Sequence, residues 1–369
     1  MKIRVAHVIP TLVQGGAEKQ MALLVSHLDR ARFDPHVVVL TADGPLRDQL
    51  VDAQVPVHFI AKKGKLDPAA AVRLRATLKK LAPDIVHTWL FAANSYGRVA
   101  AWAAGVPIVI AGERSVDPWK RWWHHAIDRL LLPITDRLVT NTQAVVEFYR
   151  RHGIPAERFQ VIPNAVEPAP GTSWTKQQVW ERLGLPPRKK LILSIGRLWP
   201  QKGYRDLIWA ADMLHNAYSD LWYVIVGSGP EFARLQKYRD DIGAADSVRF
   251  AGHQRDAREW ISACDVLWNG SRFEGQSNTI LEAMAAGKAV IASDIPGNRD
   301  LVQHEQTGYL YPLGNVQALC QMTLKLLDNE TLAQQLGDMG KQRVEQEFSL
   351  ANMVVAHERL YEQLLEQTR

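Results

Sequence analysis

Short runs of β-branched and apolar residues recur along the chain, and stretches with a helical spacing of apolar residues separate them. Strands that alternate in this way with helices of about 10–15 residues predict parallel sheets joined by right-handed crossovers, which excludes all-α and all-β folds. The runs are KIRVAHVI, HVVVLTA, VPVHFI, IVHTWL, PIVIAG and RLVTNT, and then KLILSIGRL, LWYVIVGSG, SVRFAGH, CDVLWNGS, KAVIASD and TGYLYP.

The alternation is interrupted at VIPNAVEPAPGTSW, a segment rich in Pro, Gly and Asn. A chain of 369 residues also exceeds what one hydrophobic core usually organises. We therefore expect a linker near residues 163–172. The predicted fold is α/β, with two Rossmann-like, doubly wound domains, residues 1–165 and 172–349, that face each other across a cleft.

The composition is that of an ordinary soluble protein. Apolar residues make up 47% of the chain and charged residues 22%, which excludes a disordered protein. Cys264 and Cys320 have no zinc or redox spacing, so no disulfide framework is expected. The N-terminal MKIRVAHVIP is typical of a strand rather than a signal peptide, and no stretch approaches the roughly 18 apolar residues of a membrane span. These features predict a cytoplasmic protein.

Positive charge is concentrated in the first half. Residues 1–165 contain 22 Lys and Arg against 14 Asp and Glu, a net charge of +8, whereas the remaining residues contain 22 against 25, a net charge of −3. One interpretation is a chance asymmetry of solvated surfaces, and the other is contact with an anionic partner such as a membrane surface or a phosphorylated acceptor. A nucleic-acid partner is not expected, because no nucleic-acid motif accompanies the charge.

Ligands of doubly wound sheets bind beyond the carboxyl ends of the strands, so the strand-to-helix loops are where a site is expected. The segment SRFEGQSNTILEAMAAGKAVIASD combines a strand end, a glycine loop and a helix that begins near Ser277 or Asn278. Gly275 allows close approach of the backbone. The first amides of the helix, at Gln276, Ser277 and Asn278, form an anion site at the positive end of the helix dipole. The pattern predicts a diphosphate site.

Charged residues accompany this site. Glu274 lies in the same loop and Glu282 lies deeper, within the helix, so both can point into one cleft. The loop SIGRLWPQKGY follows another strand and places Arg197 and Lys202 five residues apart, where fixed cations could neutralise a leaving diphosphate. A solvated surface pair is the alternative for these two cations.

A third loop, VIPTLVQGGAEKQ, places Gly15 and Gly16 between the first strand and a helix. A double glycine before a helix is suited to a phosphate, although such a pair is often only a tight turn.

The segments FEGQSNTILEAMAAG, GRLWPQKG and QGGAEKQ resemble the signature segments of family 4 retaining glycosyltransferases of the GT-B fold, over essentially the whole chain. The resemblance implies that Glu274 contacts the hydroxyls of the transferred sugar and that Glu282 contacts the nucleotide ribose. It also implies that Arg197 and Lys202 contact the diphosphate.

The same resemblance implies further roles. Gly16 would cap the phosphates from the first domain, and the nucleotide base would lie near Gly227 and the loop around His253. The C-terminal helix, at about residues 350–369, would pack back on the first domain.

The implied reaction is transfer of a sugar with retained anomeric configuration, through an oxocarbenium-like transition state with a nucleotide diphosphate as leaving group. The expected donor is a UDP-sugar, and the expected acceptor is a glycan, lipid-linked or other hydroxyl in polysaccharide biosynthesis. The donor is a substrate, so no cofactor is expected. The chain contains no Asp-x-Asp triplet, so we expect no metal ligands and metal-independent catalysis.

One position departs from the family pattern. Many members carry a histidine just after the fifth strand, where this chain reads AGERSVDP, with Glu113 and Arg114 in the region. The nearby His87, His124 and His125 are expected to be structural. The acceptor-side base is left unassigned.

Residues 119–131 predict a helix with an apolar face made of Trp119, Trp122, Trp123, Ala126, Ile127 and Leu130. This face could pack onto the domain's own sheet, or it could lie at the surface of an anionic membrane.

Other enzyme classes fit less well. A dehydrogenase is not expected because VGSGPEF has Phe232 at the position of the third glycine, and the chain contains no P-loop. The remaining alternatives are a sugar-nucleotide epimerase or phosphorylase on the same fold, and a catalytically silent protein that binds nucleotide sugars.

Overall fold

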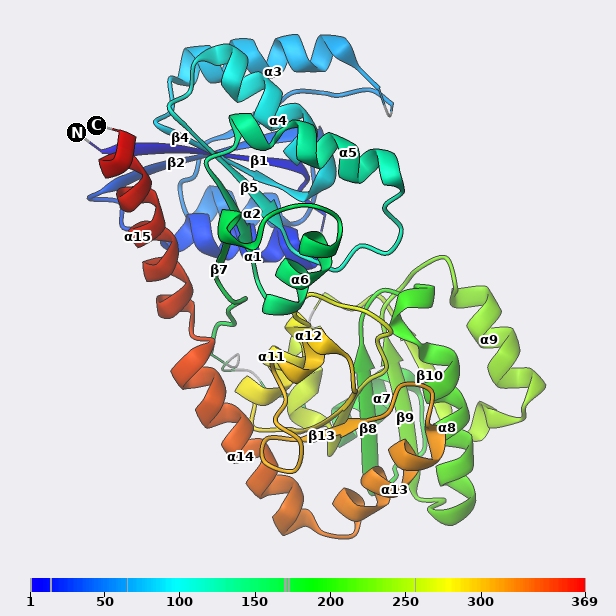
Figure 1. Cartoon of the computed structure of the whole chain (residues 1–369). Helices are drawn as coiled ribbons and strands as arrows, with labels where there is room; N and C mark the ends of the chain where they lie inside the picture. The colour runs from blue at the N-terminus through cyan, green and yellow to red at the C-terminus, as the bar shows by residue number, and fades with distance from the viewer. Residues whose placement is uncertain are drawn as a thin grey trace. The chain divides into compact units, whose positions relative to one another are not determined.

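The computed structural model describes residues 2–13, 15–64, 66–168, 171, 173–255 and 257–368. The chain divides into two compact units, Met1–Ala165 with Leu350–Arg369, and Val166–Ser349. Each unit is described by itself below (Figure 1).

The first unit is built on a seven-stranded sheet in the order β3-β2-β1-β4-β5-β6-β7, with every pair of neighbours parallel. The strands are β1 Ile3–Thr11, β2 Phe33–Ala42, β3 Val57–Phe59, β4 Ile85–Trp89, β5 Ile108–Glu113, β6 Arg137–Thr140 and β7 Phe159–Val161. The helices are α1 Gly16–His27, α2 Leu46–Asp52, α3 Pro68–Leu81, α4 Leu90–Ala104, α5 Trp122–Leu130, α6 Gln143–Arg151 and α15 Leu350–Thr368.

The second unit has a six-stranded sheet in the order β10-β9-β8-β11-β12-β13, again parallel throughout. The strands are β8 Lys190–Ile195, β9 Leu221–Val226, β10 Val248–Gly252, β11 Val266–Asn269, β12 Ala289–Ser293 and β13 Tyr309–Tyr311. The helices are α7 Lys176–Leu183, α8 Tyr204–Ala217, α9 Phe232–Asp241, α10 Ala257–Trp260, α11 Asn278–Ala285, α12 Pro296–Arg299, α13 Val316–Leu327 and α14 Glu330–Glu347.

Both faces of each sheet are covered by helices, which is why the strands read as nearly continuous apolar runs. In β1, Val5 and Ile9 pack in the cluster that contains α1 and α15, whereas Ala6 and Val8 pack in the cluster that contains α3 and α4. This alternation of faces follows from the two-residue period of a strand. The predicted doubly wound α/β class is therefore confirmed.

Each predicted run contains a strand, and β7 is an additional strand that the sequence reading missed. It is three residues long and lies at the sheet edge, directly before the Pro-rich segment. A run this short has too little alternation to stand out from a loop.

The strand order reverses between β1 and β4 in the first sheet and between β8 and β11 in the second. At such a switch point the following loops diverge to opposite faces, which leaves a crevice at the carboxyl ends of the two strands. The loops after β8 and β11 contain Arg197, Lys202 and Glu274. Within the described residues, no helix combines the length and the apolar character needed to cross a bilayer.

Candidate active site

The loops after β8 and β11 meet through an ion pair. Lys202, at the end of the 3₁₀ helix Pro200–Lys202, donates a hydrogen bond to the Glu274 carboxylate. The Ser271 hydroxyl donates to the same Glu274 oxygen at 2.9 Å. Both charged side chains are largely shielded, so their attraction is stronger than that of an exposed surface pair. The sequence named Lys202 and Glu274, and it missed Ser271.

Backbone contacts hold the two loops together. The Arg272 amide donates to the Gln201 carbonyl at 2.8 Å, and the Gln201 side chain donates to the Phe273 carbonyl at 2.7 Å. Gly203 has φ +65°, and a Cβ at this position would lie 2.1 Å from the Gly270 carbonyl oxygen. The turn therefore requires glycine, since only a residue without a side chain permits both this φ and this close approach.

The other side of the Glu274 loop rests on β12 and α12. The Ser293 hydroxyl donates to the Ser271 carbonyl at 2.5 Å, and Asn298 donates to the Ser293 carbonyl at 2.9 Å. A Cβ at Gly297 would lie 1.9 Å from the Gly275 carbonyl oxygen. The loop is thus positioned from two sides before any ligand binds, as a preorganised site requires.

Helix α11 begins at Asn278, where the sequence predicted. The Ser277 hydroxyl accepts a hydrogen bond from Asn269 at 3.0 Å and does not cap the helix. The start of a helix is a position that suits an anion. Gln276 is buried before the helix, and Glu282, its fifth residue, is also buried.

Arg197 differs from Lys202 in its surroundings. Its side chain is exposed, and its guanidinium lies 5.4 Å from the centroid of the Trp199 ring. Within the part of the chain that the structure describes, Arg197 forms no ion pair with a carboxylate, so its fork of donors remains suited to an incoming phosphate.

The loops after β8, β9 and β10 form a row. The Gly227 amide donates to the Gly252 carbonyl at 2.8 Å, and the Leu198 amide donates to the Ser228 carbonyl at 2.9 Å. Gly227 has φ +148°, and a Cβ there would lie 1.9 Å from the Gly196 carbonyl oxygen. His253 directly follows Gly252 in the chain, and it is exposed. The residues predicted to surround the nucleotide base therefore stand beside the Arg197 loop.

Gly15 and Gly16 lie in the first unit, at the start of α1. Gly15 is the residue before the helix, and a Cβ there would lie 2.2 Å from a carboxylate oxygen of Glu18. Because this carboxylate is the far end of a flexible side chain, the approach does not by itself require glycine, and the contact of Gly16 with a phosphate stays a prediction.

The residues that replace the family histidine are buried. Glu113 accepts hydrogen bonds from Tyr149 at 2.6 Å and from Asn94 at 2.9 Å, and it pairs with Lys120 at 3.3 Å. Arg114 donates to Asn164 at 2.5 Å. These contacts are typical of a structural network. This network was not predicted from the sequence, where charged residues inside otherwise apolar segments are its signal.

His87, His124 and His125 are also buried, as a structural role requires. Burial lowers the pKa of His87 well below its usual value, and it lowers the pKa of His125 to about 4. A histidine that stays neutral for this reason is held in the fold rather than offered to solvent.

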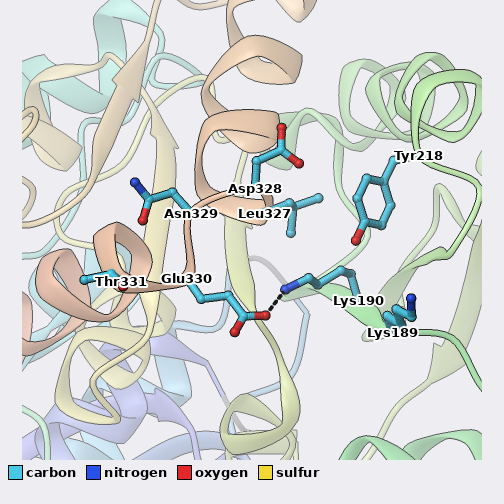
Figure 2. A pocket seen from close by; sticks show the side chains of 8 residues that line it. All are labelled: Lys189, Lys190, Tyr218, Leu327, Asp328, Asn329, Glu330 and Thr331. Carbon is cyan, nitrogen blue, oxygen red and sulfur yellow. Dashed lines mark hydrogen bonds and ion pairs between the residues drawn. The ribbon is translucent and has the colours of Figure 1, made fainter.

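A pocket away from these residues lies in the second unit. Figure 2 shows a pocket of about 660 Å³ in which Lys190 pairs with Glu330 at 2.5 Å. Lys190 is the first residue of β8, whereas Arg197 lies beyond Ile195, its last residue. The pocket is therefore at the amino-terminal end of β8, and the Arg197 loop is at its carboxyl end. None of the predicted site residues lines it. The described residues also contain no group of three or more His, Cys, Asp or Glu that could hold a metal ion.

Comparison with known proteins identifies the class. Residues 176–343 match the family model described as glycosyl transferases group 1, and residues 14–169 match the model described as glycosyltransferase family 4. Together with the paired parallel sheets, these matches define the chain as a glycosyltransferase of the GT-B fold. Within that class, it belongs to the family 4, group 1 glycosyltransferases.

Two relatives span most of the chain. The UDP-Gal:α-D-GlcNAc-diphosphoundecaprenol α-1,3-galactosyltransferase of Escherichia coli is 28% identical over 359 residues, covering 90% of this chain and 89% of that protein. The GDP-mannose-dependent α-mannosyltransferase of Mycobacterium tuberculosis is 27% identical over 347 residues, covering 85% of each. Among solved structures, Anabaena HepE in complex with UDP and glucose has a TM-score of 0.87 at 20% identity, covering 98% of this chain and all of HepE. The likeness to HepE shows the fold.

Proposed function

We propose that the chain transfers a hexose from a UDP-sugar to a hydroxyl of a glycan or lipid-linked acceptor, with retention of the anomeric configuration. The observation that carries this proposal is the Lys202–Glu274 ion pair, which stands at a topological switch point beside the start of α11. The site combines an ammonium, a carboxylate and the start of a helix at the carboxyl ends of two neighbouring strands. These groups suit the phosphates and the hydroxyls of a sugar diphosphate.

The leaving diphosphate gains negative charge as the glycosidic bond breaks. Arg197, Lys202 and the first amides of α11 would stabilise that charge, and such preorganised donors usually supply the largest part of catalysis. A bound diphosphate would compete with Glu274 for the Lys202 ammonium. Glu274 would then be released to accept hydrogen bonds from the sugar hydroxyls.

Two retaining routes remain open. In one, Glu274 forms a covalent glycosyl-enzyme. In the other, the acceptor attacks from the face that the diphosphate leaves, and the donor phosphate receives the acceptor proton. Mass spectrometry of the enzyme quenched during turnover would separate the routes, because only the first adds a hexose to the chain.

The names of the relatives support a retaining reaction and a nucleotide donor. Both relatives are named for α-linked products, one with UDP-Gal and the other with GDP-mannose. UDP is also the nucleotide bound in the HepE structure. The E. coli relative is named for a diphosphoundecaprenol-linked sugar, which favours a lipid-linked acceptor.

The first experiment is a thermal-shift measurement with UDP, GDP and ADP on wild type and on Lys202→Ala. Binding to the native state raises the melting temperature, so the proposal expects a rise with UDP that is weaker in the variant. A rise with GDP instead would correct the donor. No rise with any nucleotide would contradict the proposed nucleotide site, or would mean that the acceptor must bind first.

Product analysis separates the enzyme alternatives. An epimerase would convert the donor in the absence of acceptor, and a phosphorylase would require inorganic phosphate. The proposed transferase would form a glycoside only with acceptor, and its anomeric configuration can be read by NMR.

A further inference from the structure

Helix α5 has its polar side inward. His124, His125 and Asp128 are buried, whereas Trp122 is 79% exposed and Leu130 is 76% exposed. A surface helix of a globular protein normally has the reverse arrangement. Packing on the domain's own sheet, one of the two interpretations of this segment, is therefore wrong for the tryptophan face.

Buried ion pairs explain the orientation of α5. Asp128 accepts from Arg98 of α4 at 2.9 Å and from Lys120 at 3.0 Å, and Lys120 also reaches Tyr149 at 2.6 Å. Removing one partner from such a network would leave an uncompensated buried charge. The network thus holds the polar side of α5 inward and the tryptophans at the surface.

Helices α3, α4 and α5 form one layer of the first unit (Figure 1). Arg75 of α3 donates to the Ala103 carbonyl of α4 at 2.8 Å, and Arg98 links α4 to α5. Helix α4 adds a further exposed tryptophan, Trp102, at 64%. We call the outer side of this layer the tryptophan face, and its exposed large apolar residues are Val72, Val99, Trp102, Trp119, Trp122, Trp123 and Leu130.

The fully exposed charges of α3, α4 and α5 are all positive, while two half-buried carboxylates adjoin them: Asp67 pairs with Arg73 at 3.1 Å, and Asp117 accepts from the Trp119 indole at 3.1 Å. Every residue of α3, α4 and α5 lies in the described part of the chain, and the acidic residue among them is Asp128, which is buried and paired. The exposed bases of these helices and of the residue before α5 are Arg73, Arg75, Lys79, Lys80, Arg121 and Arg129. Exposed tryptophans among lysines and arginines are the side chains that favour the headgroup region of an anionic bilayer.

We propose that the tryptophan face docks on an anionic lipid bilayer, with Trp119, Trp122 and Trp123 at the level of the headgroups. A second copy of the chain is a poorer occupant, because a two-fold interface would place this positive layer against itself. The proposal goes beyond glycosyl transfer and depends on none of the donor loops.

The face adjoins the edge of the sheet where an acceptor is expected. Phe91, in the first turn after β4, contacts Trp119 and Trp123, with ring centroids 6.1 and 6.3 Å apart. Lys120 reaches Glu113 at the end of β5. Docking would therefore bring the carboxyl ends of β4 and β5 close to the membrane surface, where the hydroxyl of a lipid-linked acceptor lies.

The test is co-sedimentation with vesicles, which does not require turnover. Wild type should bind phosphatidylglycerol-containing vesicles at low ionic strength and phosphatidylcholine vesicles much more weakly. The Trp119→Ser, Trp122→Ser double variant should lower the partition coefficient by about tenfold. Trp209→Ser, which removes a 51% exposed tryptophan from α8 of the second unit, is the matched control and should bind as wild type.

The contribution of positive charge is tested separately with the double variant Arg121→Glu, Arg129→Glu. This variant should lose most of the salt-sensitive binding to anionic vesicles. Circular dichroism melts confirm that each variant is folded. Equal binding of the tryptophan variant and wild type would overturn the proposal. An absence of wild-type binding to phosphatidylglycerol vesicles at low ionic strength would also overturn it. A dimer that these substitutions dissociate in sedimentation velocity would then assign the face to an interface between copies.

Discussion

At the scale of single residues, Lys202 and Glu274 show how the proposed donor site is assembled. They are separated by 72 positions in the chain, yet they form an ion pair because the loops after β8 and β11 share the switch point. We expect Lys202→Ala to lower kcat by about 10²–10³-fold, because it removes a cation that stabilises the leaving diphosphate. Steady-state kinetics beside a melting curve checks this, and unchanged kcat would remove Lys202 from the mechanism.

Ser271 acts through Glu274, to which it donates a hydrogen bond at 2.9 Å. Ser271→Ala should lower kcat by about tenfold, because it removes one hydrogen bond to a charged group and a loss of this kind has an effect of about that size. Ser271→Thr keeps the hydroxyl and should recover part of the loss. If both variants lost equal activity, steric disturbance rather than the hydrogen bond would be the cause.

Gly227 shows a constraint from the backbone. Gly227→Ala combines φ +148° with a Cβ 1.9 Å from a carbonyl oxygen, so we expect it to destabilise the fold by more than about 3 kcal/mol. Gly243→Ala is the control, because it has φ +77° with open space around the Cβ, and it should cost about 1 kcal/mol. Urea denaturation of both variants measures the difference.

At the scale of elements, α15 is joined to the first sheet by buried aromatic and histidine side chains. Tyr361 and His87 form a hydrogen bond at 2.8 Å, and Trp89 donates to His7 at 3.2 Å. His357 stacks near Trp89. These contacts join residues far apart in the sequence, so α15 and β4 depend on each other for burial.

This packing predicts acid sensitivity. Burial lowers the pKa of His7 and of His357 to about 3, and it lowers the pKa of His87 well below its usual value. The positive charge of the neighbouring Arg114 lowers the pKa of His87 and of His357 further. The unfolded chain therefore binds more protons below about pH 6.5, so stability falls as the pH drops through this range. Each histidine should contribute about 1–2 kcal/mol of loss at pH 5.

Urea denaturation at about pH 7.5 and about pH 5 measures this loss. His357→Gln should reduce the dependence on pH, even though it lowers stability at both values. His304→Gln changes an exposed histidine of the second unit and is the control. A stability that does not fall between these pH values would contradict the assignment of the histidines as buried and neutral.

At the scale of the whole molecule, each unit carries a different kind of surface. The second unit has the ion-paired loops that we propose bind the donor, and the first has the positive tryptophan face. Because the proposed charge stabilisation uses Arg197, Lys202 and helix amides, we expect a chelator to leave the transfer rate unchanged. A large and reproducible loss of rate with EDTA, restored by Mg²⁺ or Mn²⁺, would contradict metal independence.

The sequence by itself determined the alternation of strands and helices, the break between the two halves and the loops that carry Arg197, Lys202 and Glu274. These features could be read because apolar periodicity, glycine turns and helix starts are local in the chain. Two of the three motif segments, GRLWPQKG and FEGQSNTILEAMAAG, also fall in the loops that the sheet order brings to the switch point of the second sheet.

Only the tertiary structure decided which side of α5 faces inward, why Glu113 is buried and how Ser271 and Gln201 position the donor loops. The reason is physical: each outcome depends on a partner distant in sequence, such as Arg98 for Asp128, Lys120 and Tyr149 for Glu113, or Phe273 for Gln201. A periodic pattern identifies the two faces of a helix, but the energy of pairing buried charges selects the face that turns inward.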